Sequence, residues 1–179
     1  MLPIGVASWI RKFYPHFTDK TCGLHIHMSF ENVKTYEMLM VPEFPVTVLE
    51  YLKRWANDQR LEPEHPLWDR LADQSKYCQH KFWPDEQVKL ERLKSPEYYD
   101  QDRNGSRYTV INYCYKLHGT MECRILPMFE SVNRAVSAVK LILDVTNASL
   151  VALAQKDKKE KCRVTTSQDS FEEYYDMTI

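Results

Sequence analysis

Two short stretches of alternating polar and apolar residues, 22–28 and 119–125, most constrain what this chain can fold into. Successive side chains of a β-strand point to opposite faces, so His25 and His27 are predicted to share one face. The polar positions of the second stretch are Thr120, Glu122 and Arg124. The sequence therefore predicts a sheet with one polar face that carries imidazole, carboxylate and guanidinium groups together.

A simpler interpretation of the same alternation is burial of one sheet face with the other face in solvent. Exposed strands of that kind favour Thr, Lys and Ser, whereas these stretches carry His-x-His and Glu-x-Arg. The residue types favour a functional surface, and the alternative remains open at this point.

The length of 179 residues is typical of one domain with a real hydrophobic core. Apolar residues make up 44% of the chain, which indicates an ordered globular protein. With 24 basic and 25 acidic residues, the net charge is close to zero. No global charge therefore directs the chain to nucleic acid or to anionic lipid.

Five cysteines, an odd number, stand without the close pairing of a zinc knuckle or a disulfide framework, which favours a reducing compartment. The N-terminus lacks the apolar core and cleavage site of a signal peptide. The sequence shows no apolar run that approaches the length of a membrane span. We therefore expect a soluble cytoplasmic protein that binds neither membrane nor nucleic acid.

Periodicity and turn signals predict the order of the secondary structure elements. The expected elements are a strand at 22–30, helices at 46–60, 66–79 and 85–94, a turn at 102–106, a strand at 107–117, a strand containing Glu122, and a long helix at 131–155 capped by Ser131. The last two strands are close in sequence and are expected to pair as an antiparallel hairpin. Residues 1–155 are thus predicted to form one domain, and residues 156–179 a charged C-terminal tail.

The order of these motifs resembles the amidoligase family of carboxylate–amine ligases, which is related to glutamate–cysteine ligase and glutamine synthetase. The resemblance covers about residues 18–155. It rests on Cys-Gly-Leu-His-Ile-His at 22–27, on Arg-Tyr at 107–108 with Asn112, and on His-Gly-Thr-Met-Glu-Cys-Arg at 118–124. It implies an α+β fold in which helices pack on one face of an antiparallel sheet and the other face binds substrates.

The resemblance also implies an ATP- and Mg²⁺-dependent reaction that forms an amide through an acyl phosphate. The substrates would be a small-molecule or peptide carboxylate and an amine. The implied metal ligands are Glu122, His25 and His27; the implied nucleotide contacts are Arg124, Arg107 and Asn112; and the implied catalytic residues are Arg124, Arg107 and His25. Magnesium prefers oxygen ligands, and phosphoryl transfer needs fixed positive charge, so these residue types suit that chemistry.

One departure from the family stands before the first predicted strand. Related proteins carry an additional strand there with a Gly-x-Glu-x-Glu-like motif, whereas Gly5-Val6-Ala7-Ser8 contains no carboxylate. Three explanations remain open: a split enzyme completed by an N-terminal subunit, a truncated reading frame, or a module that kept the fold and lost the activity. A catalytically inactive or partner-completed binding module is therefore the alternative function, and a homo-oligomer is a further possible assembly.

Two other site types fit less well. His25 and His27 with His118 or His80 could bind zinc, but neither a His-Glu-x-x-His helix nor paired cysteines support such a site. A nucleophilic cysteine is the second type. Cys123 is predicted to lie on the apolar face, where a buried thiol is inert, and the sequence identifies no positioned base for Cys22.

Overall fold

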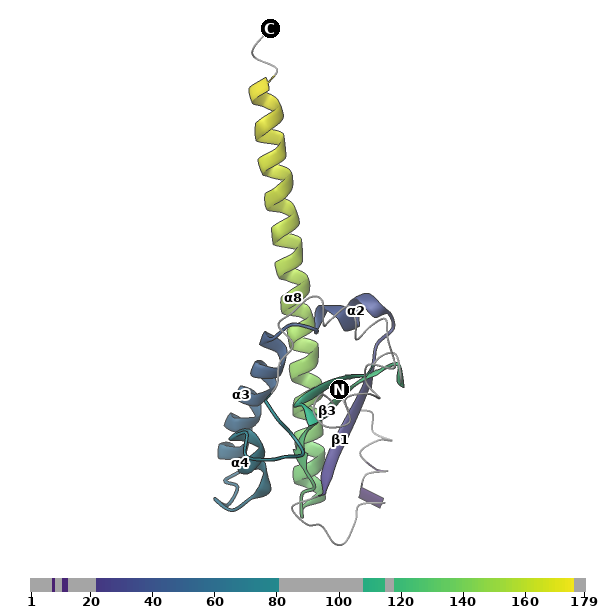
Figure 1. Ribbon diagram of the computed structural model, residues 1–179, viewed down its shortest axis with the longest axis vertical. Helices are drawn as coiled ribbons and strands as arrows, with labels where there is room; N and C mark the ends of the chain where they lie inside the picture. The colour runs from purple at the N-terminus through teal and green to yellow at the C-terminus, as the bar shows by residue number, and fades with distance from the viewer. Residues whose placement is uncertain (1–7, 9–10, 13–21, 81–107, 115–117, 176–179) are drawn as a thin grey trace.

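The computed structural model describes residues 8, 11–12, 22–80, 108–114 and 118–175, with side chains described as far as residue 159. The named elements are β1 (Gly23–Ser29), α2 (Val33–Met38), α3 (Glu43–Asp58), α4 (Pro66–Leu71), β2 (Ile111–Cys114), β3 (Thr120–Pro127) and α8 (Val132–Tyr175). This is the α+β architecture predicted from the sequence (Figure 1).

The three strands form one antiparallel sheet in the order β1-β3-β2. The predicted pairing of the two later strands is confirmed, because β2 lies directly beside β3. As the central strand, β3 is buried almost along its whole length. Its Glu122 pairs in register with His27 on one side and with Asn112 on the other, so the sheet itself brings these three residues together.

A β-bulge interrupts the pairing of β1 with β3. Leu24 lies opposite Leu126 and Ile26 lies opposite Cys123, so His25 alone faces the pair formed by Arg124 and Ile125. A bulge places an extra residue on one strand, bends that strand and redirects a side chain. Here the extra residue is on β3, beside the residues of the predicted site.

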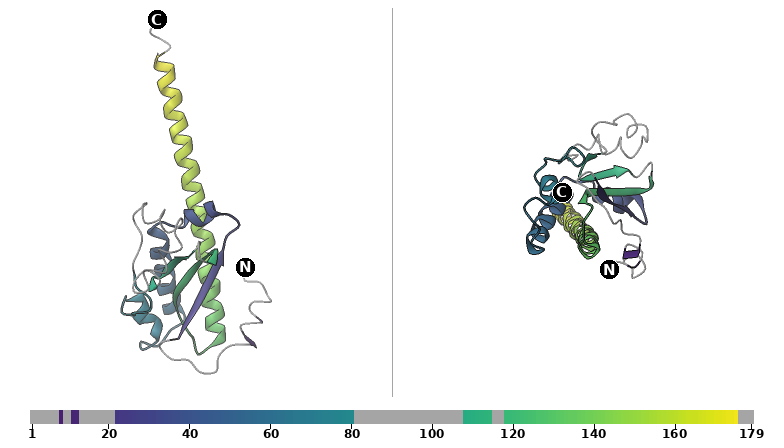
Figure 2. Two further views of the ribbon diagram at one scale, coloured as in Figure 1. Left: turned by 45° about the vertical axis from the view of Figure 1, so that its right-hand side comes forward. Right: turned by 90° about the horizontal axis from the view of Figure 1, so that it is seen from below.

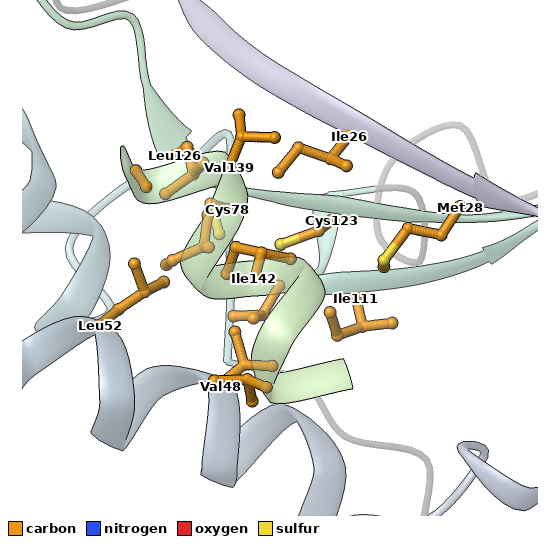
Figure 3. Close-up of a cluster of buried hydrophobic side chains, with 14 of the residues drawn as sticks. Ile26, Met28, Val48, Leu52, Cys78, Ile111, Cys123, Leu126, Val139 and Ile142 are labelled. Carbon is orange, nitrogen blue, oxygen red and sulfur yellow. The ribbon is translucent and has the colours of Figure 1, made fainter. Parts of the chain in front are cut away.

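Helices α3 and α8 lie together on one side of the sheet (Figure 2). Val48 and Leu52 of α3 pack toward Ile142 of α8, which in turn faces the apolar side of the sheet (Figure 3). Two hydrogen bonds fix this layer. Trp55 Nε1 donates to Ser137 Oγ at 3.1 Å, and Thr146 Oγ1 lies 3.5 Å from Met28 Sδ. The predicted arrangement of a long helix behind the motif strands is therefore what the structure shows.

The long helix begins as predicted and ends later than predicted. Ser131 caps its start, because Ser131 Oγ accepts from the backbone N–H of Arg134. The helix then continues beyond residue 155 as far as Tyr175 and projects from the rest of the molecule (Figure 1). Residues 128–175 contain neither glycine nor proline, so nothing in the local sequence ends the helix at the charged run.

Smaller differences concern the boundaries of other elements. Helix α3 starts at Glu43 rather than at residue 46, because Pro45 lies in the first turn, where no backbone N–H donor is needed. Helix α4 is shorter than the predicted 66–79, and β2 is shorter than the predicted 107–117. The predictions for 85–94 and 102–106 lie outside the described residues.

Within the described part of the chain, one segment is long and apolar enough to cross a membrane by length and composition, namely Val132–Lys159 of α8. Core helices of soluble proteins meet the same criterion. The buried residues of this segment, among them Val139 and Ile142, belong to the core shared with the sheet and α3. Only 28% of its most apolar stretch is buried in the molecule, so by length and composition this segment departs from the expectation that no apolar run approaches a membrane span.

Candidate functional site

Glu122 is the centre of the candidate site. It lies in the middle of the central strand β3, and its side chain is only 5% exposed. The side chains of His25 and His27 on β1 are 36% and 46% exposed. The site is therefore a buried carboxylate with two imidazoles between it and solvent, rather than the open polar face that the alternation alone suggested.

Three side chains hold the carboxylate of Glu122. Oε1 accepts from the Arg124 guanidinium at 2.8 Å and from His25 Nδ1 at 2.9 Å. Oε2 accepts from Asn112 Nδ2 at 2.8 Å. The structure thus brings together four of the predicted site residues, contributed by all three strands of the sheet.

These contacts keep Glu122 ionised. Burial on its own would raise the pKa of the carboxyl group, but the hydrogen bonds from His25 and Asn112 and the charge of Arg124 outweigh it. The pKa of Glu122 is lowered to about 2. The carboxyl group of Glu122 is therefore ionised at neutral pH.

The ionised carboxylate also fixes the tautomer of His25. A carboxylate can only accept hydrogen bonds, so the proton of His25 must lie on Nδ1, which points at Glu122 Oε1. In the neutral ring, Nε2 then has a free lone pair that can accept a proton or bind a cation. Glu122 thus orients His25 in the way that a hydrogen-bonded carboxylate orients catalytic and metal-binding histidines.

His27 takes part less directly. Its Nε2 is 3.7 Å from Glu122 Oε1, and its Nδ1 lies 3.0 Å from Thr120 Oγ1. The ring also makes an edge-to-face contact with His118, with 6.1 Å between the ring centroids. A third imidazole is thereby added to the exposed rim of the site.

Gly23 leaves the space that His25 occupies. A Cβ atom at position 23 would lie 2.8 Å from His25 Nε2, closer than real Cβ contacts, and 3.2 Å from Cδ2, which is tighter than most of them. The close approach explains the need for glycine in the Cys-Gly-Leu-His motif. It also places Nε2 of His25, whose side chain is 36% exposed, beside the backbone at Gly23.

We expect Gly23→Ala to displace the His25 ring without unfolding the protein. The new methyl group meets the movable end of a side chain, so the ring can turn away, but it then loses its hydrogen bond to Glu122. The free energy of unfolding should change by less than about 1 kcal/mol, while the ¹⁵N chemical shift of Nδ1 should report the lost hydrogen bond. Ser29→Ala, at an exposed position of the same strand, is the matched control and should leave the shift unchanged. An unaltered His25 signal in Gly23→Ala would contradict the close approach.

Arg70 of α4 is a site-supporting residue that the sequence analysis missed. It is 2% exposed, and its guanidinium donates to the backbone oxygens of Arg124 at 2.9 Å, Leu126 at 3.1 Å and Cys22 at 3.2 Å. Two of these oxygens flank the bulge in β3, and the third precedes β1. One sequence signal could have found Arg70. It stands three residues after the buried Leu67 and directly before Leu71, on the helix face where an apolar residue is usual, so a charged residue there indicates a buried partner.

Arg124 is almost completely buried, at 8% exposure. Its guanidinium carbon lies 5.4 Å from the centre of the Tyr108 ring, a cation–π contact. Among the described residues, no hydrogen-bond partner lies within reach of its Nε. Arg124 is therefore held by Glu122 and Tyr108 and retains one buried donor. Arg107, the other predicted phosphate contact, lies outside the described residues.

The structure bears on the predicted metal role of Glu122, His25 and His27 only through the donor atoms. Oε1 of Glu122 already accepts two hydrogen bonds and Oε2 accepts one, so among these contacts one lone pair of Oε2 is left for direct metal ligation. Within the described ranges, no group of three or more His, Cys, Asp or Glu side chains has the spacing of a metal site. The donor set fits an orienting carboxylate better than a metal ligand, and the metal role stays a prediction.

The alternative residues are placed as follows. His118 joins the rim of the site, whereas His80 bonds through Nε2 to the carbonyl oxygen of Arg70, away from Glu122. Cys123 is fully buried, and burial raises its pKa to about 12, so it cannot serve as a nucleophile at neutral pH. Glu31, a carboxylate close to β1 in sequence, is exposed in the bend that follows this strand.

Comparison of the chain with protein-family models, with curated proteins and with solved structures finds no match.

Proposed function

We propose that this chain carries part of the site of an ATP-dependent carboxylate–amine ligase of the amidoligase type. The single observation behind the proposal is the buried Glu122 carboxylate, which holds His25 with Nε2 available and pairs with the buried Arg124. An amide-forming enzyme needs a group that removes a proton from the attacking amine and fixed positive charge for its anionic substrates. His25 and Arg124 are of the right types for these tasks.

The proposed reaction has two steps. The substrate carboxylate attacks the γ-phosphorus of magnesium-bound ATP, which forms an acyl phosphate and releases ADP. The amine then attacks the acyl carbon, phosphate leaves, and an amide is formed. In this scheme His25 Nε2 accepts the proton that the amine nitrogen loses. The magnesium ion enters with the nucleotide as part of the substrate, bound chiefly through the phosphates.

The charges around the site support anionic substrates. Two buried guanidinium groups, those of Arg70 and Arg124, lie near the carboxylate. Burial and, to a smaller extent, the charge of Arg124 lower the pKa of Arg70, but Arg70 donates to three backbone oxygens, so Arg124 is the group proposed to contact anions. Glu122 balances the charge of Arg124. Carboxylates and phosphates are the ligands that guanidinium groups recognise best.

A binding module completed by a partner subunit is the second candidate. Glu122 is the one carboxylate in the cluster of described residues around His25, whereas magnesium bound to nucleotide is usually held by several oxygens. Further carboxylates supplied by a second polypeptide would complete such a site. A reducing, cytoplasmic location is part of both proposals.

Nucleotide binding provides the first test. We expect the chain alone to bind magnesium–ATP weakly by isothermal titration calorimetry, with a Kd of about 1 mM or above. His25→Gln combined with His27→Gln should weaken the binding further while the fold is kept, because both side chains are partly exposed. Turnover is then measured as phosphate release in the presence of pooled carboxylic acids and amines.

The outcomes separate the two candidates. Phosphate release that requires both a carboxylate and an amine supports the ligase, and a partner that raises it supports completion by a second subunit. Binding and turnover that are unaffected by the double substitution would remove His25 from the proposal. If nucleotide fails to bind even in the presence of a candidate partner, the ligase proposal is wrong.

A further inference from the structure

An apolar groove lies on the side of the molecule away from the candidate site. It has a volume of about 550 Å³ and runs between the start of α3 and the middle of α8. Its apolar lining includes Val41, Phe44, Tyr51, Leu141, Val145 and Ala148. Tyr51 is 45% exposed, which is unusual for a large aromatic side chain that lines an apolar groove.

The part of α8 that borders the groove is apolar and poorly covered. Only 28% of the most apolar stretch within Val132–Lys159 is buried in the molecule. Ala148 and Ala152 are exposed on the groove side, and Val151 is 50% exposed. Since a soluble protein rarely leaves a continuous apolar surface in water, this surface calls for a partner.

Charges of opposite sign flank the two ends of this surface. Glu43 and Asp144 line the groove, so the end toward the start of α8 carries two carboxylates, and Asp144 Oδ2 accepts from the exposed Lys140 Nζ at 3.0 Å. Three turns further along the same helix, the exposed Lys156 begins a run that includes Lys158 and Lys159. A helix of the same kind, packed in the antiparallel direction, would place its basic end over this acidic end.

We propose that the groove is the interface through which two copies of this chain form a symmetric dimer, with the two α8 helices antiparallel. Two-fold symmetry pairs each residue reciprocally. We place Ala148 opposite Ala152 of the partner subunit. In this register Asp144 lies opposite Lys156 of the partner subunit, and the two-fold axis makes each of these pairs occur twice. The small side chains at the centre allow the helices to approach closely, and the ion pairs set the register.

Self-association is measured by sedimentation or by size-exclusion chromatography with light scattering, over protein concentrations of about 1–500 μM. The native chain should form dimers. Ala148→Glu, which places charge at the centre of the interface, should weaken dimerisation by about 30-fold or more. Asn147→Glu is the matched control, because residue 147 is also exposed on α8 but does not line the groove, and it should leave the dimer intact.

Charge reversal tests the register, with unfolding of each variant measured alongside because Asp144 also pairs with Lys140 on its own helix. Lys156→Glu should weaken the dimer by about 10-fold, and adding Asp144→Lys should restore it. A native chain that stays monomeric over the whole range overturns the proposal. So does a dimer that tolerates both Ala148→Glu and the single charge reversal. Binding to vesicles of neutral lipid that Ala148→Glu abolishes, without any dimer in solution, would assign the surface to a membrane instead.

Discussion

Glu122→Gln is expected to lower the free energy of unfolding by about 3 kcal/mol, the usual cost of removing one partner from a buried ion pair. The substitution keeps the shape of the side chain but leaves Arg124 buried without its counter-charge. The amide of Gln keeps one oxygen, which can accept from His25 and Arg124, but the NH2 group that replaces the other oxygen cannot accept from Asn112 Nδ2. The measurement is denaturant unfolding of the native and variant chains at neutral pH.

The ion pair of Glu122 with Arg124 also predicts how the free energy of unfolding depends on pH. The pKa of Glu122 lies at about 2 in the folded chain, below its ordinary value of 4.5. A lowered pKa means that the carboxylate stabilises the fold fully above about pH 4.5, and that this contribution is lost as the pH falls toward 2. The difference in stability between the native chain and Glu122→Gln should therefore be largest at neutral pH and shrink below pH 4.5.

Glu50→Gln provides the control, since Glu50 is exposed on α3. It should change stability by less than about 0.5 kcal/mol. A Glu122→Gln variant as stable as the native chain would show that the ion pair is not the structural centre of the sheet.

The strands and the faces on which their side chains lie could be read from the sequence, because both depend on local alternation. His25 and His27 alternate with Ile26 and Met28, and the structure places the latter two in the core. The hairpin of β2 with β3 followed from sequence proximity. The far end of α8 was not predicted, because the charged run that begins at Lys156 is typical of a solvated tail. Such a run also gives no indication that an apolar surface for a partner lies earlier on the same helix.

The composition of the site was predictable, but its burial was not. Alternation assigns Glu122 and Arg124 to the polar face, yet it cannot reveal that β3 is the central strand or that Tyr108 covers Arg124. Contacts between residues distant in sequence determine both facts. Arg70 escaped notice for the same reason: it lies 54 residues before Arg124, whose carbonyl oxygen it binds.

The bulge links these observations to the proposed chemistry. A regular pairing of β1 with β3 would place one residue of β3 opposite His25, whereas the structure places Arg124 and Ile125 there. The extra residue lets Arg124 and His25 reach the same oxygen of Glu122. Arg70 binds the backbone oxygens around this irregularity, and so the geometry of the site depends on a residue outside it.

Arg70→Met should therefore be at least as damaging as the loss of Glu122. It leaves the carbonyl oxygens of Arg124 and Leu126 buried without this donor, and each such loss costs about 1–3 kcal/mol. We expect the free energy of unfolding to fall by about 3 kcal/mol or more in denaturant unfolding. Hydrogen exchange of the amides near the bulge should accelerate more than that of the amides in α3.

Two comparisons separate the hydrogen bonds of Arg70 from its charge and volume. Arg70→Lys keeps the positive charge, but an ammonium group cannot reproduce the planar fork that reaches three oxygens, so it should recover only part of the lost stability. Lys53→Met, at an exposed position of α3, should stay within about 0.5 kcal/mol of the native chain. Full stability in Arg70→Lys would mean that charge alone suffices. Full stability in Arg70→Met would mean that the carbonyl oxygens at the bulge find other donors, and that α4 does not hold the site in place.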